Sequence, residues 1–207
     1  LEELCDKYRS KDGSFDVIVP GSGGKDSSYV AYVLKERYDM NPLTVTWASC
    51  LSTDIGRQNL DSFIDSGYDN ILVTPNGQIH RKLSRLSLLE FGENFLPFDY
   101  GQIHVPIRIA VNFNIPFVMY GEDGSLEYGG DLKNYDNPLV DFGGDDYVIE
   151  QFSPSNKPTR PEYWLSHVDK KDLLWYMLPP MDKIKKVGVV EHYFSYYENW
   201  KPEEHYE

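Results

Sequence analysis

The stretch PGSGGKDSSYVAY, which begins at Pro20, constrains the fold of this chain more than any other part of its sequence. It follows an apolar run over Phe15–Pro20 and continues into a helical pattern from Lys25 to Tyr38. A buried strand that ends in glycines and passes into a helix is typical of α/β proteins whose loop binds an anion at the helix N-terminus. We therefore interpret this stretch as a strand, an anion-binding loop and a helix.

Three kinds of anion-binding loop compete for this stretch. A dinucleotide fingerprint requires a third glycine where this chain has Asp26, and that carboxylate would face the pyrophosphate. A Walker A loop requires a first glycine where this chain has Val19, and a hydroxyl residue in place of Asp26. The pattern S-G-G-x-D-S, in contrast, is complete from Ser22 to Ser27. It resembles the pyrophosphate loop (PP-loop) of ATP pyrophosphatases, which cleave ATP between the α and β phosphates.

The residue types in this loop suit ATP that carries Mg²⁺. Gly23 and Gly24 let backbone N–H groups approach phosphate oxygens closely, and the following helix directs its positive end at them. Lys25 neutralises phosphate charge, and Asp26 suits a magnesium ion bound to the pyrophosphate, so we expect both to be catalytic. Three serines add hydroxyl donors: Ser22, Ser27 and Ser28. The alternative is a glycine-rich turn that binds no ligand.

Strands and helices alternate from Phe15 to Asp123, which predicts an α/β fold with a doubly wound parallel sheet. The expected strands cover 15–20, 43–49, 70–75 and 116–123, and the expected helices cover 25–38, 54–67, 79–91 and 100–113. Asp54 suits the N-cap of the second helix, and Gly67 suits its end. Sheets of this kind bind ligands at the carboxyl ends of their strands.

The periodicity weakens after Asp123, although the stretches 169–180 and 187–197 predict a short helix and a late strand. We therefore expect residues 1–130 to form the nucleotide-binding core. Residues 131–207 form an irregular C-terminal extension that packs on this core and covers the substrate.

Composition limits the classes of function. The formal net charge of −13 repels phosphate backbones, so we expect no nucleic-acid partner. No apolar run approaches the roughly 20 residues that span a bilayer, and no signal peptide is visible, so we expect no membrane span and a cytoplasmic location. The two cysteines, Cys5 and Cys50, form no C-x-x-C, which disfavours a disulfide framework or a cysteine-rich zinc site.

Five segments between Tyr8 and Gly130 together resemble the N-acetyl sugar amidotransferases of surface-polysaccharide (lipopolysaccharide O-antigen) synthesis. They are YRSKDGSFDVIVPGSGGKDSSYVAYVLK, NPLTVTWAS, TDIGRQN, NILVTPNGQIHRKLSRL and YGEDGSLEYGG. The resemblance implies an adenine nucleotide alpha hydrolase-like fold. It also implies that ATP, Mg²⁺ and ammonia convert the acetamido group of a sugar into an acetamidino group, with release of AMP and pyrophosphate. The chain departs from the family at Gly21, where valine is common, and this should loosen the loop.

Strand ends provide further candidate site residues. Trp47 and Ser49 close the second strand, where we expect them to bind adenine, although core packing explains Trp47 equally well. Glu122 follows the fourth strand and is a candidate catalytic residue that binds magnesium or substrate. Glu127 and Tyr128 come shortly afterwards and are candidates for closing over the sugar.

The segment HRKLSRL gathers positive charge in an otherwise acidic chain. At helical spacing Arg81 and Arg85 share one face, which suits a carboxylate or a diphosphate on the sugar. A solvated helix face is the alternative. His80 is a candidate for substrate binding and proton transfer, or a histidine with a structural role.

The source of ammonia follows from the cysteines. A glutaminase needs a cysteine nucleophile activated by a histidine, and neither Cys5 nor Cys50 stands in such a setting, so we expect a separate glutaminase partner. The rival enzyme is a tRNA-modifying ATP pyrophosphatase, which needs a basic surface. A non-catalytic adenine-nucleotide-binding subunit is the rival from another class, and it predicts the loss of Asp26 or of a loop serine.

Overall fold

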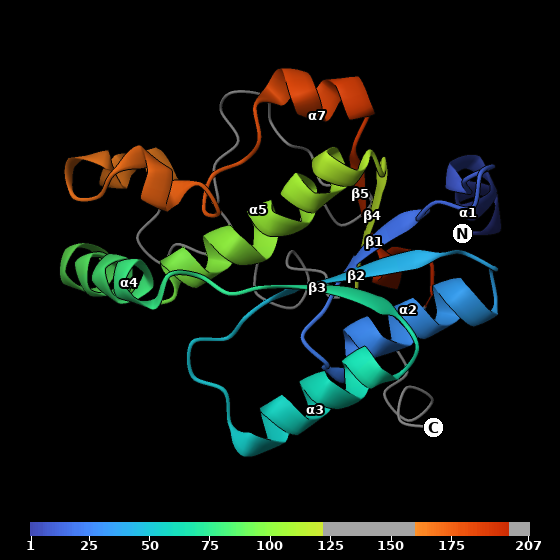
Figure 1. Ribbon diagram of the computed structural model, residues 1–207, viewed down its shortest axis with the longest axis horizontal. Coiled ribbons are helices and arrows are strands. Elements are labelled where there is room, and N and C mark those ends of the chain that lie inside the picture. Colours follow the sequence, from blue (N-terminus) through green and yellow to red (C-terminus); the bar gives the residue numbers. More distant parts are fainter. Residues whose placement is uncertain (122–159, 199–207) are drawn as a thin grey trace.

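The computed structural model describes residues 1–121 and 160–198. In this part of the chain five parallel strands form one sheet, in the order β3-β2-β1-β4-β5 (Figure 1). The strands are β1 Val17–Pro20, β2 Pro42–Trp47, β3 Asp69–Val73, β4 Phe117–Tyr120 and β5 Val190–Tyr193. The predicted α/β fold with a doubly wound parallel sheet is confirmed. The strand order reverses between β1 and β4, and such a switch point opens a crevice at the carboxyl ends of the strands.

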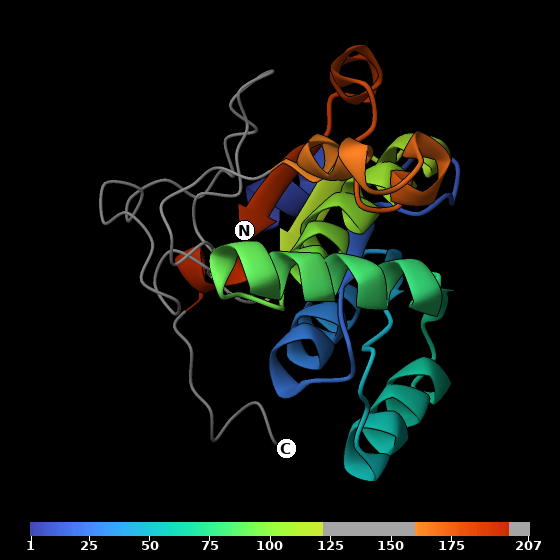
Figure 2. The same ribbon diagram turned by 90° about the vertical axis from the view of Figure 1, so that its left-hand side faces the viewer.

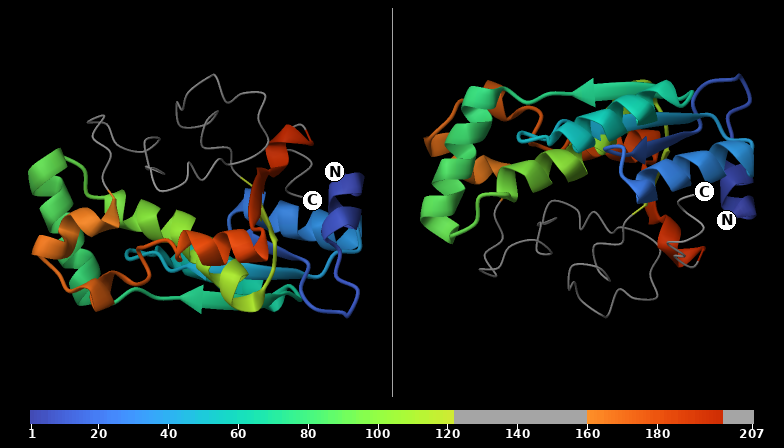
Figure 3. Two further views of the ribbon diagram at one scale, coloured as in Figure 1. Left: turned by 90° about the horizontal axis from the view of Figure 1, so that it is seen from above. Right: turned by 90° about the horizontal axis from the view of Figure 1, so that it is seen from below.

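Helices cover both faces of this sheet, as the view from above in Figure 3 shows. One face carries α1 (Glu2–Tyr8), α2 (Lys25–Glu36) and α3 (Asp54–Asp65). The other carries α4 (Gly77–Phe91), α5 (Leu96–Phe113) and α7 (Met181–Val187). Because side chains alternate along a strand, Val17 and Val19 enter the first core whereas Ile18 enters the second. None of the helices in the described residues is long and apolar enough to cross a bilayer.

The end of the described chain packs against the same cores. Three 3-10 helices lie there: η4 Pro161–Ser166, η5 Lys170–Leu173 and η6 Phe194–Tyr196. His104 Nδ1 of α5 lies 2.5 Å from the Tyr176 carbonyl oxygen, and Arg108 donates a hydrogen bond to the Met177 carbonyl. These bonds anchor the segment between η5 and α7 to the middle of α5.

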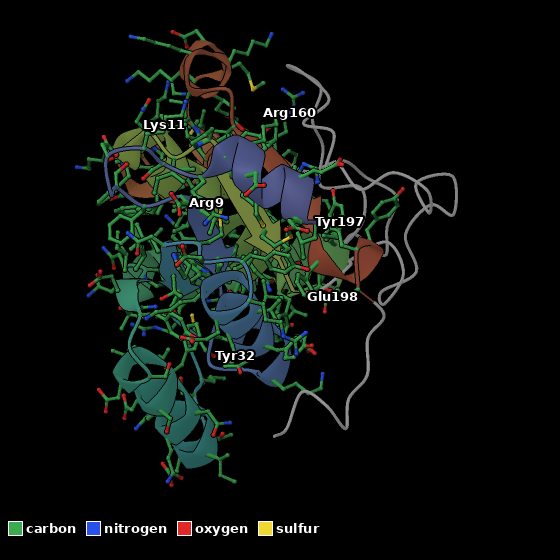
Figure 4. The ribbon with its side chains drawn as sticks, turned by 90° about the vertical axis from the view of Figure 1, so that its right-hand side faces the viewer. Arg9, Lys11, Tyr32, Arg160, Tyr197 and Glu198 are labelled. Carbon is green, nitrogen blue, oxygen red and sulfur yellow. The ribbon has the colours of Figure 1, made fainter. Side chains whose placement is uncertain are left out.

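The two edges of the sheet differ. Figure 2 looks onto the carboxyl edge, where α4 crosses in front of the strands and α3 projects below. Figure 4 shows the opposite side, where Tyr197 and Glu198 follow η6. There the Tyr197 hydroxyl lies 2.6 Å from His192 Nδ1, and Glu198 lies 3.7 Å from Arg37. These contacts hold η6 and the residues after it against β5 and the end of α2.

Local details correct some expectations. Thr53, rather than Asp54, is the N-cap of α3, because its hydroxyl accepts a hydrogen bond from Gly56 N–H. The helix α5 begins at Leu96, one turn earlier than expected, since a proline at Pro97 is compatible with the first turn. The helix expected over 169–180 is the short η5 followed by a turn. The sequence patterns predicted neither α1 nor α7.

Candidate active site

The glycine loop joins β1 to α2, and Gly24 is the N-cap of the helix. Gly23 has a φ of +83°, which favours glycine. A Cβ atom at this position would lie 2.6 Å from the Asn59 carbonyl oxygen and 2.8 Å from the Leu60 nitrogen, both backbone atoms of α3. Glycine is therefore required at position 23 for two reasons: the left-handed backbone conformation and the close approach of the backbone to α3. The helix α3 supports the loop from below.

A lysine–aspartate pair opens α2. Lys25 Nζ lies 2.6 and 2.7 Å from the two carboxylate oxygens of Asp26, and both side chains are partly buried. The position suits a carboxylate because the first turn of a helix carries partial positive charge. Gly121, at the end of β4, packs against this turn, since a Cβ atom there would lie 3.0 Å from the Asp26 carbonyl carbon. The pair thus stands where β1, α2 and β4 meet.

The loop serines have local partners. The hydroxyls of Ser27 and Ser28 donate to the Gly24 carbonyl oxygen at 3.2 and 2.9 Å. Ser22 is exposed at the tip of the loop. A Cβ atom at Gly21 would lie 2.9 Å from the side chain of Ser27, so a larger residue at Gly21 would displace that hydroxyl. Glycine at this position therefore leaves room for Ser27 in its observed place.

A pocket of about 170 Å³ adjoins the loop at the carboxyl edge of the sheet. The strands and the loop provide one wall, and α5 provides the other. The lining residues are Pro20, Gly21, Ser22, Ser27, Val45, Trp47, Phe98, Gln102, Pro106, Tyr120 and Gly121. Aromatic and apolar side chains make up most of the pocket lining, and the loop contributes hydroxyl groups and backbone atoms. A flat apolar ring attached to phosphates matches that division.

Trp47 forms part of the pocket and part of the core. Its side chain is 6% exposed and meets the Tyr176 ring edge-on at 5.6 Å. A Cβ atom at Gly101 would lie 2.0 Å from its Cε2 atom, so the indole rests directly on the backbone of α5. Within the described residues its Nε1–H has no hydrogen-bond partner. Ser49 is exposed and does not line this pocket.

Replacing Gly101 by alanine should weaken nucleotide binding by about tenfold or more. Alanine normally favours a helix over glycine by about 1 kcal/mol, but here its methyl group would displace the Trp47 indole from the pocket wall. The matched control is Gly77→Ala in α4, where the nearest atom to the new methyl group is Arg81 Nη1 at 3.4 Å. Calorimetric titration with magnesium ATP measures the effect. Equal affinity in both variants would show that Trp47 does not form the ligand wall.

The basic segment does not form a single cluster around His80. His80 is buried, its Nδ1 lies 3.1 Å from the Tyr176 hydroxyl, and burial lowers its pKa. Arg81 and Arg85 are exposed on α4, whereas Lys82 donates to the His167 carbonyl oxygen. The structure therefore separates the histidine from the two arginines. Their roles in substrate binding stay predictions.

Three of the predicted site residues cannot be placed relative to this pocket. Glu122, Glu127 and Tyr128 lie outside the described residues. The last described residue before them is Gly121, which rests against the first turn of α2. The predicted role of Glu122 therefore stays a prediction.

Neither cysteine is set up as a nucleophile. Burial raises the pKa of the Cys5 thiol to about 11, and partial burial also raises that of Cys50. A reactive cysteine needs a lowered pKa, because the thiolate is the nucleophile. In the described part of the chain, no group of three or more His, Cys, Asp or Glu side chains is placed to hold a metal ion.

The sequence patterns did not single out the α5 residues that line the pocket, or the contact between Tyr120 and Glu191. The Tyr120 hydroxyl lies 3.1 Å from Oε1 of Glu191, which is 1% exposed on β5. Burial raises the pKa of this carboxyl group to about 8. The available signal for this contact was a glutamate within the β-branched and aromatic stretch of the late strand. Strands of that composition rarely bury a carboxylate, so the residue stands out.

No protein-family model matches this sequence, and comparison with curated proteins finds no significant match. Several solved structures resemble it at a distance, and two of them illustrate the similarity. The U34-tRNA thiolase NcsA from Methanococcus maripaludis aligns over 90% of this chain and 61% of its own, with 16% identity and a TM-score of 0.44. A predicted tRNA methyltransferase subunit from Methanocaldococcus jannaschii aligns over 56% and 60%, with 17% identity and a TM-score of 0.37. The aligned part thus spans about three fifths of each structure.

Proposed function

We propose that this protein is a PP-loop ATP pyrophosphatase that converts the acetamido group of an N-acetylated sugar into an acetamidino group. The observation that carries the ATP-binding part is the complete S-G-G-x-D-S pattern at the β1–α2 junction, with Gly23 held against α3. The sugar part rests on the resemblance of the five segments. The products are the modified sugar, AMP and pyrophosphate.

The residues present fit magnesium ATP. Backbone N–H groups at the start of α2 suit the phosphates, and Asp26 offers a partly buried carboxylate oxygen, which is the ligand that Mg²⁺ prefers. Bound Mg²⁺ would neutralise phosphate charge as pyrophosphate departs. Asp26 would hold the ion, and Lys25 would then exchange its carboxylate partner for a phosphate oxygen. Ser22, Ser27 and Ser28 would donate to the remaining oxygens.

The aromatic pocket beside the loop suits adenine. Trp47, Phe98 and Tyr120 line a space that adjoins the loop, so a purine there lies within one nucleotide length of the phosphates. Ser49 would act from outside this pocket, on the exposed side of the strand end.

The chemistry requires activation of a weak electrophile. The amide oxygen attacks the α-phosphorus, and the bond to pyrophosphate breaks. Ammonia then attacks the amide carbon, AMP leaves with the former amide oxygen, and the nitrogen loses a proton. The protein chiefly orients these groups and stabilises charge. Arg81 and Arg85 would bind an anionic group of the sugar, with His80, Glu122, Glu127 and Tyr128 as further candidates.

Nitrogen is expected to arrive as ammonia from a separate glutaminase. The raised pKa values of both thiols support this, because glutamine hydrolysis needs an activated cysteine. Of the ammonia supplied in solution, only the unprotonated form, NH₃, can attack the amide carbon. The rate with ammonium salts should therefore rise with pH until another group titrates.

The test is product formation by the purified chain. We expect AMP, pyrophosphate and an amidino sugar from ATP, ammonium chloride and a panel of free and nucleotide-linked N-acetylhexosamines, and no product with glutamine as the nitrogen source. AMP formation with unmodified tRNA instead of sugar would favour the tRNA-modifying alternative. Tight ATP binding without AMP under every condition would favour a non-catalytic subunit. Product from glutamine that is lost in Cys50→Ala would contradict the separate glutaminase.

A further inference from the structure

Glu191 is a carboxyl group enclosed within the protein. It lies on β5 opposite Val118 of β4, and its side chain is 1% exposed. Its carboxyl oxygen Oε1 lies 3.1 Å from the Tyr120 hydroxyl, within hydrogen-bond distance. The buried polar residue stands at the outer strand of the sheet, where an apolar side chain would pack without penalty. The cost of burying a carboxyl group here indicates that Glu191 has a role beyond packing.

Tyr120 connects this carboxyl group to the pocket. It is the last residue of β4, and it lines the pocket next to Gly121. Its hydroxyl also lies 3.4 Å from the Ile103 carbonyl oxygen of α5. These two contacts hold the ring between β5 and α5, where it lines the pocket together with Trp47 and Phe98.

We propose that Glu191 is a positioning residue of the nucleotide pocket, whose uncharged carboxyl group holds the Tyr120 hydroxyl and so fixes the aromatic wall beside Gly121. The proposal deepens the proposed function, because it takes the pocket to be the nucleotide site. An uncharged carboxyl group can donate to the tyrosine oxygen while the tyrosine donates to Ile103, so both contacts are satisfied at once. An ionised one only accepts, and it would draw the tyrosine proton away from Ile103.

The surroundings favour the uncharged form. Burial raises the pKa of Glu191 to about 8, and the Tyr120 bond lowers it only in part. Two titratable groups of α5 are engaged elsewhere: His104, whose pKa is lowered to about 4 by burial, lies against the Tyr176 carbonyl oxygen, and Arg108 donates to the Met177 carbonyl oxygen. On β5 itself, His192 bonds to Tyr197. No cation of the described residues contributes to the Glu191 shift.

A pH dependence follows with a defined sign. Because the folded-state pKa lies above the ordinary value of 4.5, the folded protein holds an extra proton between these two values. The resulting stability is fully present at acidic pH and is lost as pH rises through about 8. Above that pH the buried charge would attract water and release the Tyr120 ring, so nucleotide affinity should fall in the same range.

The test compares wild type with Glu191→Gln, which keeps the size and stays uncharged. We expect the two proteins to bind magnesium ATP within about twofold at pH 7. From pH 7 to pH 9 we expect wild type to lose about fivefold or more, as for a lost hydrogen bond, and Glu191→Gln to lose less than about twofold. Glu36→Gln, at an exposed site on α2, is the matched control and should follow wild type.

A second measurement needs no ligand. In protein labelled with ¹³C-tyrosine, the Tyr120 signal, assigned with Tyr120→Phe, should titrate near pH 8 in wild type and not in Glu191→Gln. A signal that is unchanged by Glu191→Gln would overturn the inference, as would an equal loss of ATP affinity in both proteins. Absence of ATP binding in every variant at every pH would overturn the proposed function and the nucleotide role of this pair, whereas the tyrosine titration alone would then still establish the contact.

Discussion

Replacing Asp26 by asparagine should abolish AMP formation, with a loss of at least about a hundredfold, while the fold is retained. Asparagine keeps the shape of the side chain but removes the charge that is proposed to hold Mg²⁺ on the pyrophosphate. The substitution also removes the carboxylate partner of Lys25, which lies 2.6 Å away. Without this competing carboxylate Lys25 would attract phosphate more strongly, so ATP affinity should change little or rise. We therefore expect turnover to fall without a matching loss of ATP affinity.

Quenched-flow measurement of AMP with sugar and ammonium present gives the turnover, and calorimetry gives the affinity. Asp54→Asn is the matched control because it removes an exposed carboxylate from the first turn of a neighbouring helix, α3. Near-normal turnover in Asp26→Asn would exclude Asp26 as the magnesium ligand. Parallel losses of turnover and ATP binding would point to a disordered loop.

Gly23→Ala should destabilise the protein by about 2–4 kcal/mol and remove nucleotide binding. The φ of +83° disfavours any side chain by about 1 kcal/mol or more, and the new methyl group would also collide with the α3 backbone 2.6 Å away. A backbone atom cannot rotate aside as a flexible side chain can. Either the loop or α3 must therefore move, and each is needed to present N–H groups to phosphate.

Gly13→Ala separates the two causes. Gly13 has a similar φ of +81°, but a Cβ atom there meets nothing within 4 Å. This variant should therefore show the conformational penalty alone, about 1 kcal/mol in the free energy of unfolding, with normal ATP affinity. Urea unfolding of both variants measures the difference. Equal destabilisation would mean that α3 yields readily and does not support the loop.

Local sequence was sufficient for the parts of this protein that depend on neighbouring residues. The S-G-G-x-D-S pattern of the β1–α2 loop could be identified from the sequence because its glycines, lysine and aspartate are consecutive in the chain. The alternation of strands and helices predicted the parallel sheet, because period-two and helical patterns are set within each segment. Element ends were off by a few residues, as at Thr53, where capping competes between adjacent polar side chains.

Tertiary structure alone decided what surrounds the loop. Trp47 lies against Gly101, and Tyr120 bonds to Glu191, although 54 and 71 residues separate these partners in the chain. Nothing within a local window distinguishes Gly101 from another helix glycine, or a buried Glu191 from an exposed one. Their environment arises when β5 joins the edge of the sheet and α5 crosses its face, because packing brings together side chains whose own segments carry no record of the partner. Sequence thus determined the loop on which the proposed phosphate chemistry depends, and packing determined the pocket that adjoins it.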